Sequence, residues 1–464
     1  MDPVLIGEIL AALMFAGVIA TLMLGFPVAF SLAGISLFFS LVGWLFGIFD
    51  PSNFGALASR YVGFMTNEVL VAVPLFIFMG VTLEKSGIAE QLLATMGKVF
   101  GRLPGGLGIS VVLVGALLAA STGVVGATVV TMGLISLPTM LKAGYNPKLA
   151  CGVICASGTL GQIIPPSTVM IFMGDMLAGI NAQVQMSKGN FAPTPVSVGD
   201  LFAGSVLPSA VLIGLYLLYM IYKAVTDPES CPPTPPTEAE RASLLKDVLF
   251  SLVPPLLLVL AVLGSILGGI ATPTEAASVG AVGAMLLVLV NRRFNLTMLR
   301  QTCLTTASIT SMVFVLVLGA AVFSVVFRML GGDDLVHEML SSLPGGAMGA
   351  LIIVMLVMFV LGFILDTFEL IFIIIPITAP ALLHLGVDPV WLGVLVGVNL
   401  QTSFMTPPFG FSLIYLRGVA PRTISTGDMY RGALPFVGLQ MVALAIVLMF
   451  PALATWLPKV IYGG

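Results

Sequence analysis

Charge is scarce in this sequence, and the scarcity excludes most classes of soluble protein. Only 8% of its 464 residues are charged, whereas 58% are apolar. Soluble domains usually carry about 25% charged residues, which cover their surfaces. Disordered chains are excluded as well, because they are poor in apolar residues. The composition therefore predicts a membrane protein that crosses the bilayer several times.

Histidine, cysteine and basic runs are also few, which removes the material for several kinds of chemistry. The sequence has two histidines, His337 and His384, and no His-Glu-x-x-His pattern. Its four cysteines show no zinc-binding spacing. No run of basic residues is longer than Arg292-Arg293, and the net charge is -3. We therefore expect no enzyme, no organic cofactor, no transition-metal site and no nucleic-acid partner.

Long apolar runs are abundant, and most have the length of a transmembrane helix. A helix needs about 20 apolar residues to cross a hydrocarbon core of about 30 Å. Each such run is expected to form one span of an all-α fold. The runs are 4–24, 27–48, 68–86, 201–222, 248–270, 274–291, 303–327 and 432–456.

Two further runs, about 107–141 and 347–383, are too long for a single span. Each would make a helix of about 50 Å at a rise of 1.5 Å per residue. Each begins after Leu-Pro-Gly-Gly and carries polar residues midway, around Ser121 in the first and Asp366 in the second. A re-entrant helical hairpin, which enters and leaves the membrane on the same side, explains both features.

Two more over-long runs, about 147–179 and 389–416, are interrupted by proline pairs. The pair begins at Pro165 in the first run and at Pro407 in the second. These patterns predict broken transmembrane helices. A break, like a hairpin tip, leaves backbone groups unpaired at membrane depth, where they must face protein, water or ligand.

The same markers occur twice in the same order along the chain. Leu103-Pro-Gly-Gly recurs 240 residues later at Leu343, and the proline pair at Pro165 recurs 242 residues later at Pro407. Such internal repeats are typical of secondary transporters. We therefore expect two structural repeats, each with one hairpin and one broken helix.

The stretch 227–247 separates these repeats, which cover 1–226 and 248–464. Its prolines and charges are typical of an exposed linker. Lys and Arg mark the cytoplasmic side of short loops. They gather in loop 85–102 but not in its counterpart 328–343. This asymmetry predicts inverted repeats, a cytoplasmic linker, and both termini outside the cytoplasm.

Small and polar residues gather at the hairpin tips and beside the breaks, where backbone carbonyls attract cations and amides attract anions. The candidates in the first half are Ser121, Thr122, Gly123 and Gly126 at the tip, and Ser157, Gly158, Thr159, Gly161 and Gln162 before the break. The candidates in the second half are Asp366, Thr367 and Glu369 at the tip, and Asn399, Gln401, Thr402, Ser403 and Thr406 before the break.

Each candidate also has a structural interpretation. Small residues such as Gly126 and Gly161 let helices approach closely. Asp366 is an intramembrane carboxylate, which points to a functional site, but a structural ion pair or a capped tip is the alternative. Glu369 either shares the face of Asp366 or caps the second arm of the hairpin. The role of Asp175 stays open.

Two runs resemble the signatures of a known family. The run 156–167, ASGTLGQIIPPS, and the run 399–410, NLQTSFMTPPFG, are similar to the paired signatures in the large membrane subunit of tripartite ATP-independent periplasmic (TRAP) transporters. The run LGFILD, which ends at Asp366, is similar to the second hairpin of that family. The resemblance covers nearly the whole chain, and the surroundings of Ser121 and of 415–418 resemble the mannitol/chloroaromatic branch.

The resemblance implies an elevator-type sodium symporter of the bacterial inner membrane, with periplasmic termini in this chain. It also implies two partners, a small membrane subunit of four helices on a separate chain and a periplasmic binding protein that delivers an organic acid. The alternative is a sodium-coupled or proton-coupled anion transporter of the same architecture that works without a binding protein. The sequence does not identify the acid.

The resemblance further assigns roles to the candidates. One sodium site would use Ser121, Thr122, Gly123 and Gly126 with Ser157, Gly158, Thr159 and Gly161. The other would use Asp366 and Thr367 with Asn399, Gln401, Thr402 and Thr406. The substrate would lie between the tips, near Thr122, Gln162, Pro165, Asp366, Ser403 and Pro407. Many relatives show Gly-Ser-Ser at the first tip, where this chain has Gly123-Val124-Val125.

Overall fold

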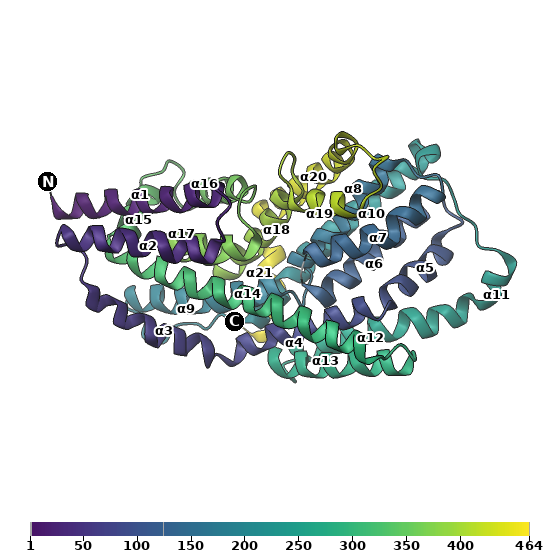
Figure 1. Ribbon diagram of the computed structural model, residues 1–464, viewed down its shortest axis with the longest axis horizontal. Helices are drawn as coiled ribbons and strands as arrows, with labels where there is room; N and C mark the ends of the chain where they lie inside the picture. The colour runs from purple at the N-terminus through teal and green to yellow at the C-terminus, as the bar shows by residue number, and fades with distance from the viewer. Residues whose placement is uncertain (1, 124, 464) are drawn as a thin grey trace. The chain divides into compact units, whose positions relative to one another are not determined.

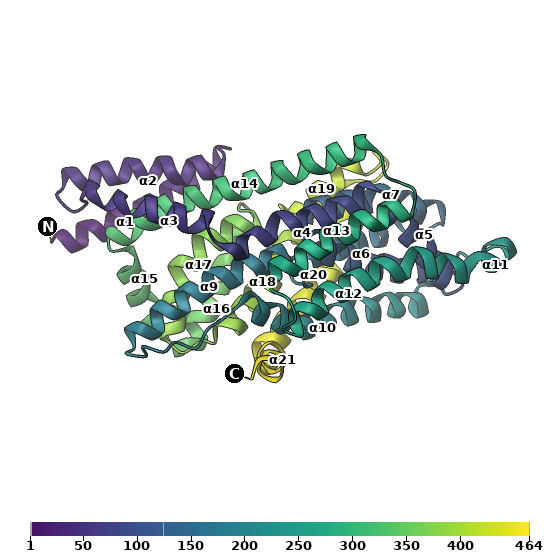
Figure 2. The ribbon, with the colours of Figure 1, turned by 90° about the horizontal axis from the view of Figure 1, so that it is seen from below.

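The chain is helical throughout the part that the structure describes (Figures 1 and 2). The computed structural model describes residues 2–123 and 125–463, without the side chains of Ser121 and Thr122, and contains no strand in these ranges. Nine helices in this part are long and apolar enough to cross a membrane, or up to eleven if two bent pairs each count as one span. The expectation of an all-α polytopic membrane protein is confirmed.

The helices of the first half match the predicted runs closely. The run 107–141 forms two helices, α6 and α7, and the run 147–179 is broken between α8 and α9. The elements are α1 (Pro3–Met23), α2 (Val28–Leu45), η1 (Pro51–Phe54), α3 (Gly55–Met65), α4 (Glu68–Lys85), α5 (Ile88–Phe100), α6 (Gly106–Thr122), α7 (Val125–Lys142), α8 (Pro147–Thr159), η2 (Leu160–Gln162), α9 (Thr168–Ser187) and α10 (Val198–Thr226).

The second half follows the same succession after the linker. The run 347–383 forms α16 and α17, and the run 389–416 is broken between α18 and α19. The elements are η3 (Pro228–Ser230), α11 (Glu238–Asp247), η4 (Val248–Leu252), α12 (Val253–Leu267), α13 (Pro273–Val290), α14 (Leu296–Met329), α15 (Gly332–Ser341), α16 (Gly346–Leu361), α17 (Thr367–His384), α18 (Pro389–Met405), α19 (Phe411–Val419), α20 (Thr426–Met449) and α21 (Ala452–Tyr462).

Local sequence signals explain where several helices begin. Asn146 precedes Pro147, and its side chain accepts a hydrogen bond from the Lys148 amide at 2.9 Å. Thr272 forms a capping box with Glu275 at the start of α13. These side chains satisfy backbone N–H groups that have no partner in the first turn of a helix.

The inverted arrangement of the two halves in the membrane stays a prediction.

The chain divides into two compact units, each built from segments of both sequence halves. Unit 1 comprises Met1–Leu70, Asp175–Ser197 and Ser308–Leu392, and unit 2 comprises Val71–Gly174, Val198–Ala307 and Gly393–Gly464.

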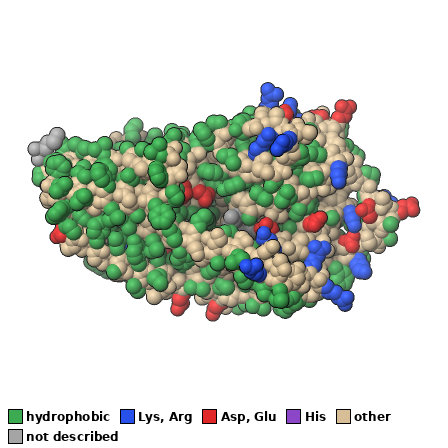
Figure 3. Space-filling view, in the orientation of Figure 1, with side chains coloured by type: hydrophobic (Ala, Val, Ile, Leu, Met, Phe, Trp, Pro, Cys, Tyr) green, Lys and Arg blue, Asp and Glu red, His purple; other side chains and the backbone are tan. Residues whose placement is uncertain are grey.

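Unit 1 contains the second hairpin and exposes an apolar face. Within it α1 packs along α2, and α15 packs against α1 and α17 (Figure 2). Large apolar side chains of α2 are open to the surroundings, including Phe30 (69% exposed), Phe38 and Trp44. Figure 3 shows hydrophobic side chains over this part of the surface. A soluble monomer rarely exposes so continuous an apolar face, so lipid or a membrane partner must cover it.

Unit 2 is organised around α8, the first part of the first broken helix. This helix packs against α6, α7, α19 and α20, and its residues from Leu149 to Thr159 are all buried. The first hairpin, α6 with α7, therefore lies directly against the first signature. The base of this hairpin is held by Tyr145, whose hydroxyl accepts hydrogen bonds from the Leu107 and Gly108 amides, and burial raises the pKa of Tyr145 to about 12.

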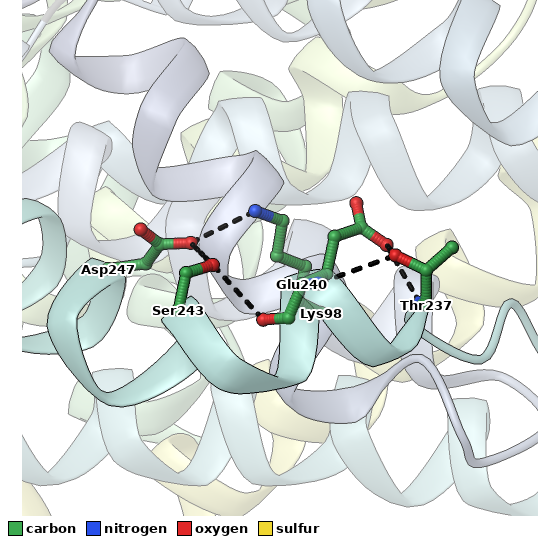
Figure 4. A network of polar contacts seen from close by, with 5 residues as sticks. All are labelled: Lys98, Thr237, Glu240, Ser243 and Asp247. Atoms are coloured by element: carbon green, nitrogen blue, oxygen red, sulfur yellow. Dashed lines mark hydrogen bonds and ion pairs between the residues drawn. The ribbon is translucent and has the colours of Figure 1, made fainter.

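The linker contains a helix, α11, that packs against α5. Figure 4 shows its polar contacts: Thr237 and Glu240 form a capping box at its start, and the Asp247 carboxylate lies 3.0 Å from Lys98 Nζ of α5. Ser243 donates a hydrogen bond to the same carboxylate at 3.2 Å. The second part of the linker is therefore an ordered helix rather than an extended connection.

The Lys98–Asp247 ion pair is expected to contribute little to stability. Both side chains are about a quarter exposed, and exposed ion pairs contribute about 0–1 kcal/mol. Lys98→Ala should therefore leave the melting temperature of the detergent-solubilised protein nearly unchanged. A melting temperature lowered by ten degrees or more would mean that this pair holds α11 in place.

Candidate functional site

The first hairpin tip is tied to the start of α9. Gly123 ends α6 with a left-handed backbone, φ 60°, and Thr168 Oγ1 donates a hydrogen bond to its carbonyl oxygen at 3.0 Å. A Cβ on Gly123 would lie 2.9 Å from that hydroxyl oxygen, so glycine is required by both backbone and space. The tip thus meets the chain just after the break at Pro165.

Two of the predicted ligands, Ser121 and Thr122, belong to this tip. Ser121 and Thr122 form the last turn of α6, but their side chains lie outside the described part of the structure, as does Val124. Gly126 follows in α7, where a Cβ would lie 3.2 Å from the ring of Tyr415. Gly126 therefore allows α7 to approach α19.

At the first break, the Ser167 hydroxyl contacts two buried backbone carbonyl groups. Helix α8 ends at Thr159 and η2 ends at Gln162. Ser167 Oγ lies 2.8 Å from the carbonyl oxygen of Gly161 and 3.1 Å from that of Gln162, in hydrogen-bonding geometry with both. The same short stretch therefore presents backbone carbonyl oxygens beside a hydroxyl group, which are the kinds of group that coordinate cations in broken helices.

Small residues before this break bring three helices together. Gly161 lies opposite Ala119 of α6, with 3.5 Å between its ideal Cβ position and the Ala119 carbonyl oxygen. A Cβ on Gly158 would overlap Val129 of α7. Ser157 is fully buried, and its hydroxyl donates a hydrogen bond to the Val153 carbonyl oxygen at 2.6 Å. Gly158 thus has a packing role that is independent of any ligand.

The second hairpin tip is a capped helix start. Asp366 is the N-cap of α17, and its carboxylate accepts a hydrogen bond from the Thr367 amide at 2.7 Å. Glu369 completes the capping box by accepting one from the Asp366 amide, also at 2.7 Å. Of the two roles considered for Glu369, the structure shows the cap. Both carboxylates lie at the tip of unit 1's hairpin, and Thr367 is buried.

The hydroxyl groups of the second signature bond to their own helix. Thr402, Ser403 and Thr406 each donate to a carbonyl oxygen three or four residues earlier, at 2.7 to 2.9 Å. A hydroxyl group that donates its hydrogen keeps its oxygen lone pairs, which can still bind a cation. Asn399 and Gln401 are also buried. These residues belong to unit 2, whereas Asp366 belongs to unit 1.

The structure joins two residues that the sequence assigned to different sites. Gln401 Nε2 of α18 lies 3.3 Å from Thr159 Oγ1 of α8 and 3.5 Å from the Tyr216 hydroxyl of α10. Gln440 Nε2 of α20 lies 3.4 Å and 2.8 Å from the same two oxygens. All four side chains are fully buried. We call Thr159, Tyr216, Gln401 and Gln440 the four-helix polar cluster.

Sequence reasoning missed this cluster, including Tyr216 and Gln440, although two signals for it were present. Thr159 and Gln401 are separated by 242 residues, which is also the offset between the two proline pairs. Gln440 is a polar residue in the middle of the apolar run of α20. Which side chains of α10 and α20 face this point depends on helix packing, which the sequence alone does not give.

The remaining carboxylates near the membrane have partners of their own. Asp175 accepts a hydrogen bond from Asn67 Nδ2 at 2.7 Å within unit 1, and Glu84 accepts one from Thr131 Oγ1 at 2.8 Å within unit 2. In the described residues, no group of three or more His, Cys, Asp and Glu side chains could hold a metal ion.

Comparison with known proteins identifies the family to which these features belong. Residues 15–453 match the family described as the tripartite ATP-independent periplasmic transporter, DctM component. The chain belongs to this family. It is similar to the C4-dicarboxylate TRAP transporter large permease protein DctM of Vibrio cholerae, with 32% identity over 88% of each chain. It is also similar to the ectoine TRAP transporter large permease protein TeaC of Halomonas elongata, with 29% identity over 84% of this chain and 86% of that one.

A solved structure shares the fold of this DctM-family chain. The YdaH transporter of Alcanivorax borkumensis superposes with a TM-score of 0.62 at 16% identity, over 87% of this chain and 89% of that one. At this identity the likeness concerns the fold alone. The relatives are named as transporter permeases, so the expectation of a membrane transporter rather than an enzyme is confirmed.

Proposed function

We propose that this chain is the large permease of a transporter that imports a small organic acid into a bacterium across the inner membrane. The observation that carries the proposal is the pairing, within unit 2, of a hairpin tip with the break of the next helix through Thr168 and Gly123. Relatives are named for C4-dicarboxylate and for ectoine, which are small molecules that bear carboxylates. The amide and carbonyl groups at tips and breaks suit such a cargo and its coupling ion.

Sodium is the proposed coupling ion. The carbonyl oxygens of Gly161 and Gln162, together with nearby hydroxyl groups, are hard and largely neutral ligands. One sodium ion would bind at the first tip and break, and another at the second hairpin tip, where Asp366 and Thr367 lie. The individual ligands remain predictions. Alternating access of the elevator type requires two bodies that move against each other, and the division of the chain into two compact units supports it.

Two partners complete the proposed transporter. The family description is that of a tripartite transporter, so a small membrane subunit and a periplasmic binding protein would work with this chain. The small subunit is a candidate to cover part of the apolar surface of unit 1, with lipid covering the rest. Both termini are proposed to lie in the periplasm.

Uptake by reconstituted vesicles tests this function. A thermal-shift screen of organic acids on the cognate binding protein would first identify the cargo. Vesicles that contain this chain and the small subunit should then take up that acid only when the binding protein is added. Uptake at the same rate without the binding protein would instead identify a stand-alone transporter of the same architecture.

A further inference from the structure

The four-helix polar cluster connects the two signature segments at a single point. Thr159 belongs to the first signature, and Gln401 belongs to the second. The two residues occupy equivalent positions in the two repeats, since both lie six residues before the proline pair. Their side chains are in hydrogen-bond contact at 3.3 Å. Equivalent positions of two repeats can touch each other only near the axis that relates the repeats.

Packing alone does not explain two amides at this point. The Oε1 atoms of Gln401 and Gln440 are buried and have no hydrogen-bond partner among the described residues. A buried polar atom without a partner destabilises the folded state, so an apolar side chain would be the more stable choice. The two amide nitrogens do connect α8 with α10, because each contacts both the Thr159 hydroxyl and the Tyr216 hydroxyl.

Tyr216 and Gln440 fix the geometry of this bridge from outside the signatures. Their contact at 2.8 Å is the shortest in the cluster, and the Tyr216 ring packs edge-on against Phe436 of α20 at 5.5 Å. Each also contacts Thr159 or Gln401 directly. The pair therefore contacts both signature segments near their first residues.

We propose that Tyr216 and Gln440 are positioning residues that make the two signature segments respond together, so that an ion bound at one break changes the affinity of the other. The sodium part of this inference rests on the function proposed above. The mechanical part, that the cluster holds both segments, stands on the hydrogen bonds alone.

Tyr216→Phe tests the mechanical part with a matched control. The substitution removes one oxygen and keeps the ring on Phe436. Tyr219→Phe is the control, because Tyr219 lies on the same helix and packs on the same Phe436 at 5.0 Å but takes no part in the cluster. Amide hydrogen exchange in peptides covering 157–162 and 400–404 should quicken about fivefold in Tyr216→Phe, the effect of one lost hydrogen bond. It should not change in Tyr219→Phe.

Sodium titration of uptake tests the functional part. Tyr216→Phe and Gln440→Met should raise the sodium concentration for half-maximal uptake about fivefold and lower the Hill coefficient toward one, with the maximal rate kept. Faster exchange confined to peptides around Tyr216 itself, or an equal effect in Tyr219→Phe, would overturn the inference. If wild-type uptake ignores sodium while both signature segments still loosen, the proposed coupling ion is wrong and the positioning role stands.

Discussion

Gly432→Ala should sharply reduce the amount of folded protein. Gly432 of α20 faces α8, and a Cβ at this position would overlap the carbonyl oxygen of Lys148. Gly152 of α8 lies in the same contact, where a Cβ would overlap the carbonyl oxygen of Gly432. Both obstacles are backbone, so the helices themselves must separate. Overpacking of a core costs about 1–3 kcal/mol and sometimes more, and a backbone obstacle places this substitution at the upper end.

Gly438→Ala is the matched control for this prediction. Gly438 lies in the same helix, and a Cβ there would meet nothing within 4 Å. Fluorescence-detected size-exclusion chromatography and a thermal melt should show a large loss for Gly432→Ala and wild-type behaviour for Gly438→Ala. Equal behaviour of the two variants would show that α8 and α20 are not in close contact, and the description of unit 2 would then fail.

Asp366→Asn should raise the sodium concentration for half-maximal uptake about tenfold or more. Asparagine caps a helix as well as aspartate does, so the start of α17 is preserved and only the negative charge is lost. Hydrogen bonds and contacts to a charged group contribute about 1.5–3 kcal/mol, and every 1.4 kcal/mol is about a factor of ten in affinity. The measurement is the sodium dependence of uptake in vesicles.

Glu369→Gln separates the two carboxylates of this tip. Glutamine also completes a capping box. The variant therefore removes the charge of Glu369, three residues after Asp366, and keeps the hydrogen bond from the Asp366 amide. We expect a much smaller change in sodium dependence than for Asp366→Asn. If Asp366→Asn leaves sodium dependence unchanged, Asp366 is not a sodium ligand, and equal effects of both variants would indicate a general effect of charge.

Repetition within the sequence made most of the membrane helices predictable. The hairpins were expected at about 107–141 and 347–383, and the helices that form them run from Gly106 to Lys142 and from Gly346 to His384. Proline pairs located both breaks, because proline cannot continue a helix. These features are local in the sequence, so local reasoning is sufficient for them.

Several helices, among them α5, α11 and α15, were not predicted from hydropathy, and the bounds of α20 were wrong. The last span was expected at 432–456, but α20 begins at Thr426 and ends at Met449. Ser425 caps it by accepting a hydrogen bond from the Asp428 amide, and Ser-x-x-Asp is a helix-start pattern that hydropathy ignores. Helix α11 was overlooked for the same reason, since the capping pair of Thr237 and Glu240 stands in a charged segment.

The candidate site was predictable in part. The sequence located both tips and both breaks, but it gave no means of pairing side chains across helices. Thr159 and Gln401 were therefore placed in separate sites, whereas the structure joins them through Tyr216 and Gln440. Contacts of this kind depend on how helices rotate and pack, which no local pattern records.

Accumulation of the cognate acid under controlled ion gradients tests the central claim most directly. Vesicles would contain this chain and its small subunit, with the binding protein and its acid supplied outside. The account predicts accumulation above the external concentration under an inward sodium gradient, lost when a sodium ionophore dissipates that gradient. Equal accumulation with sodium balanced across the membrane, sustained by an inward proton gradient, would contradict it.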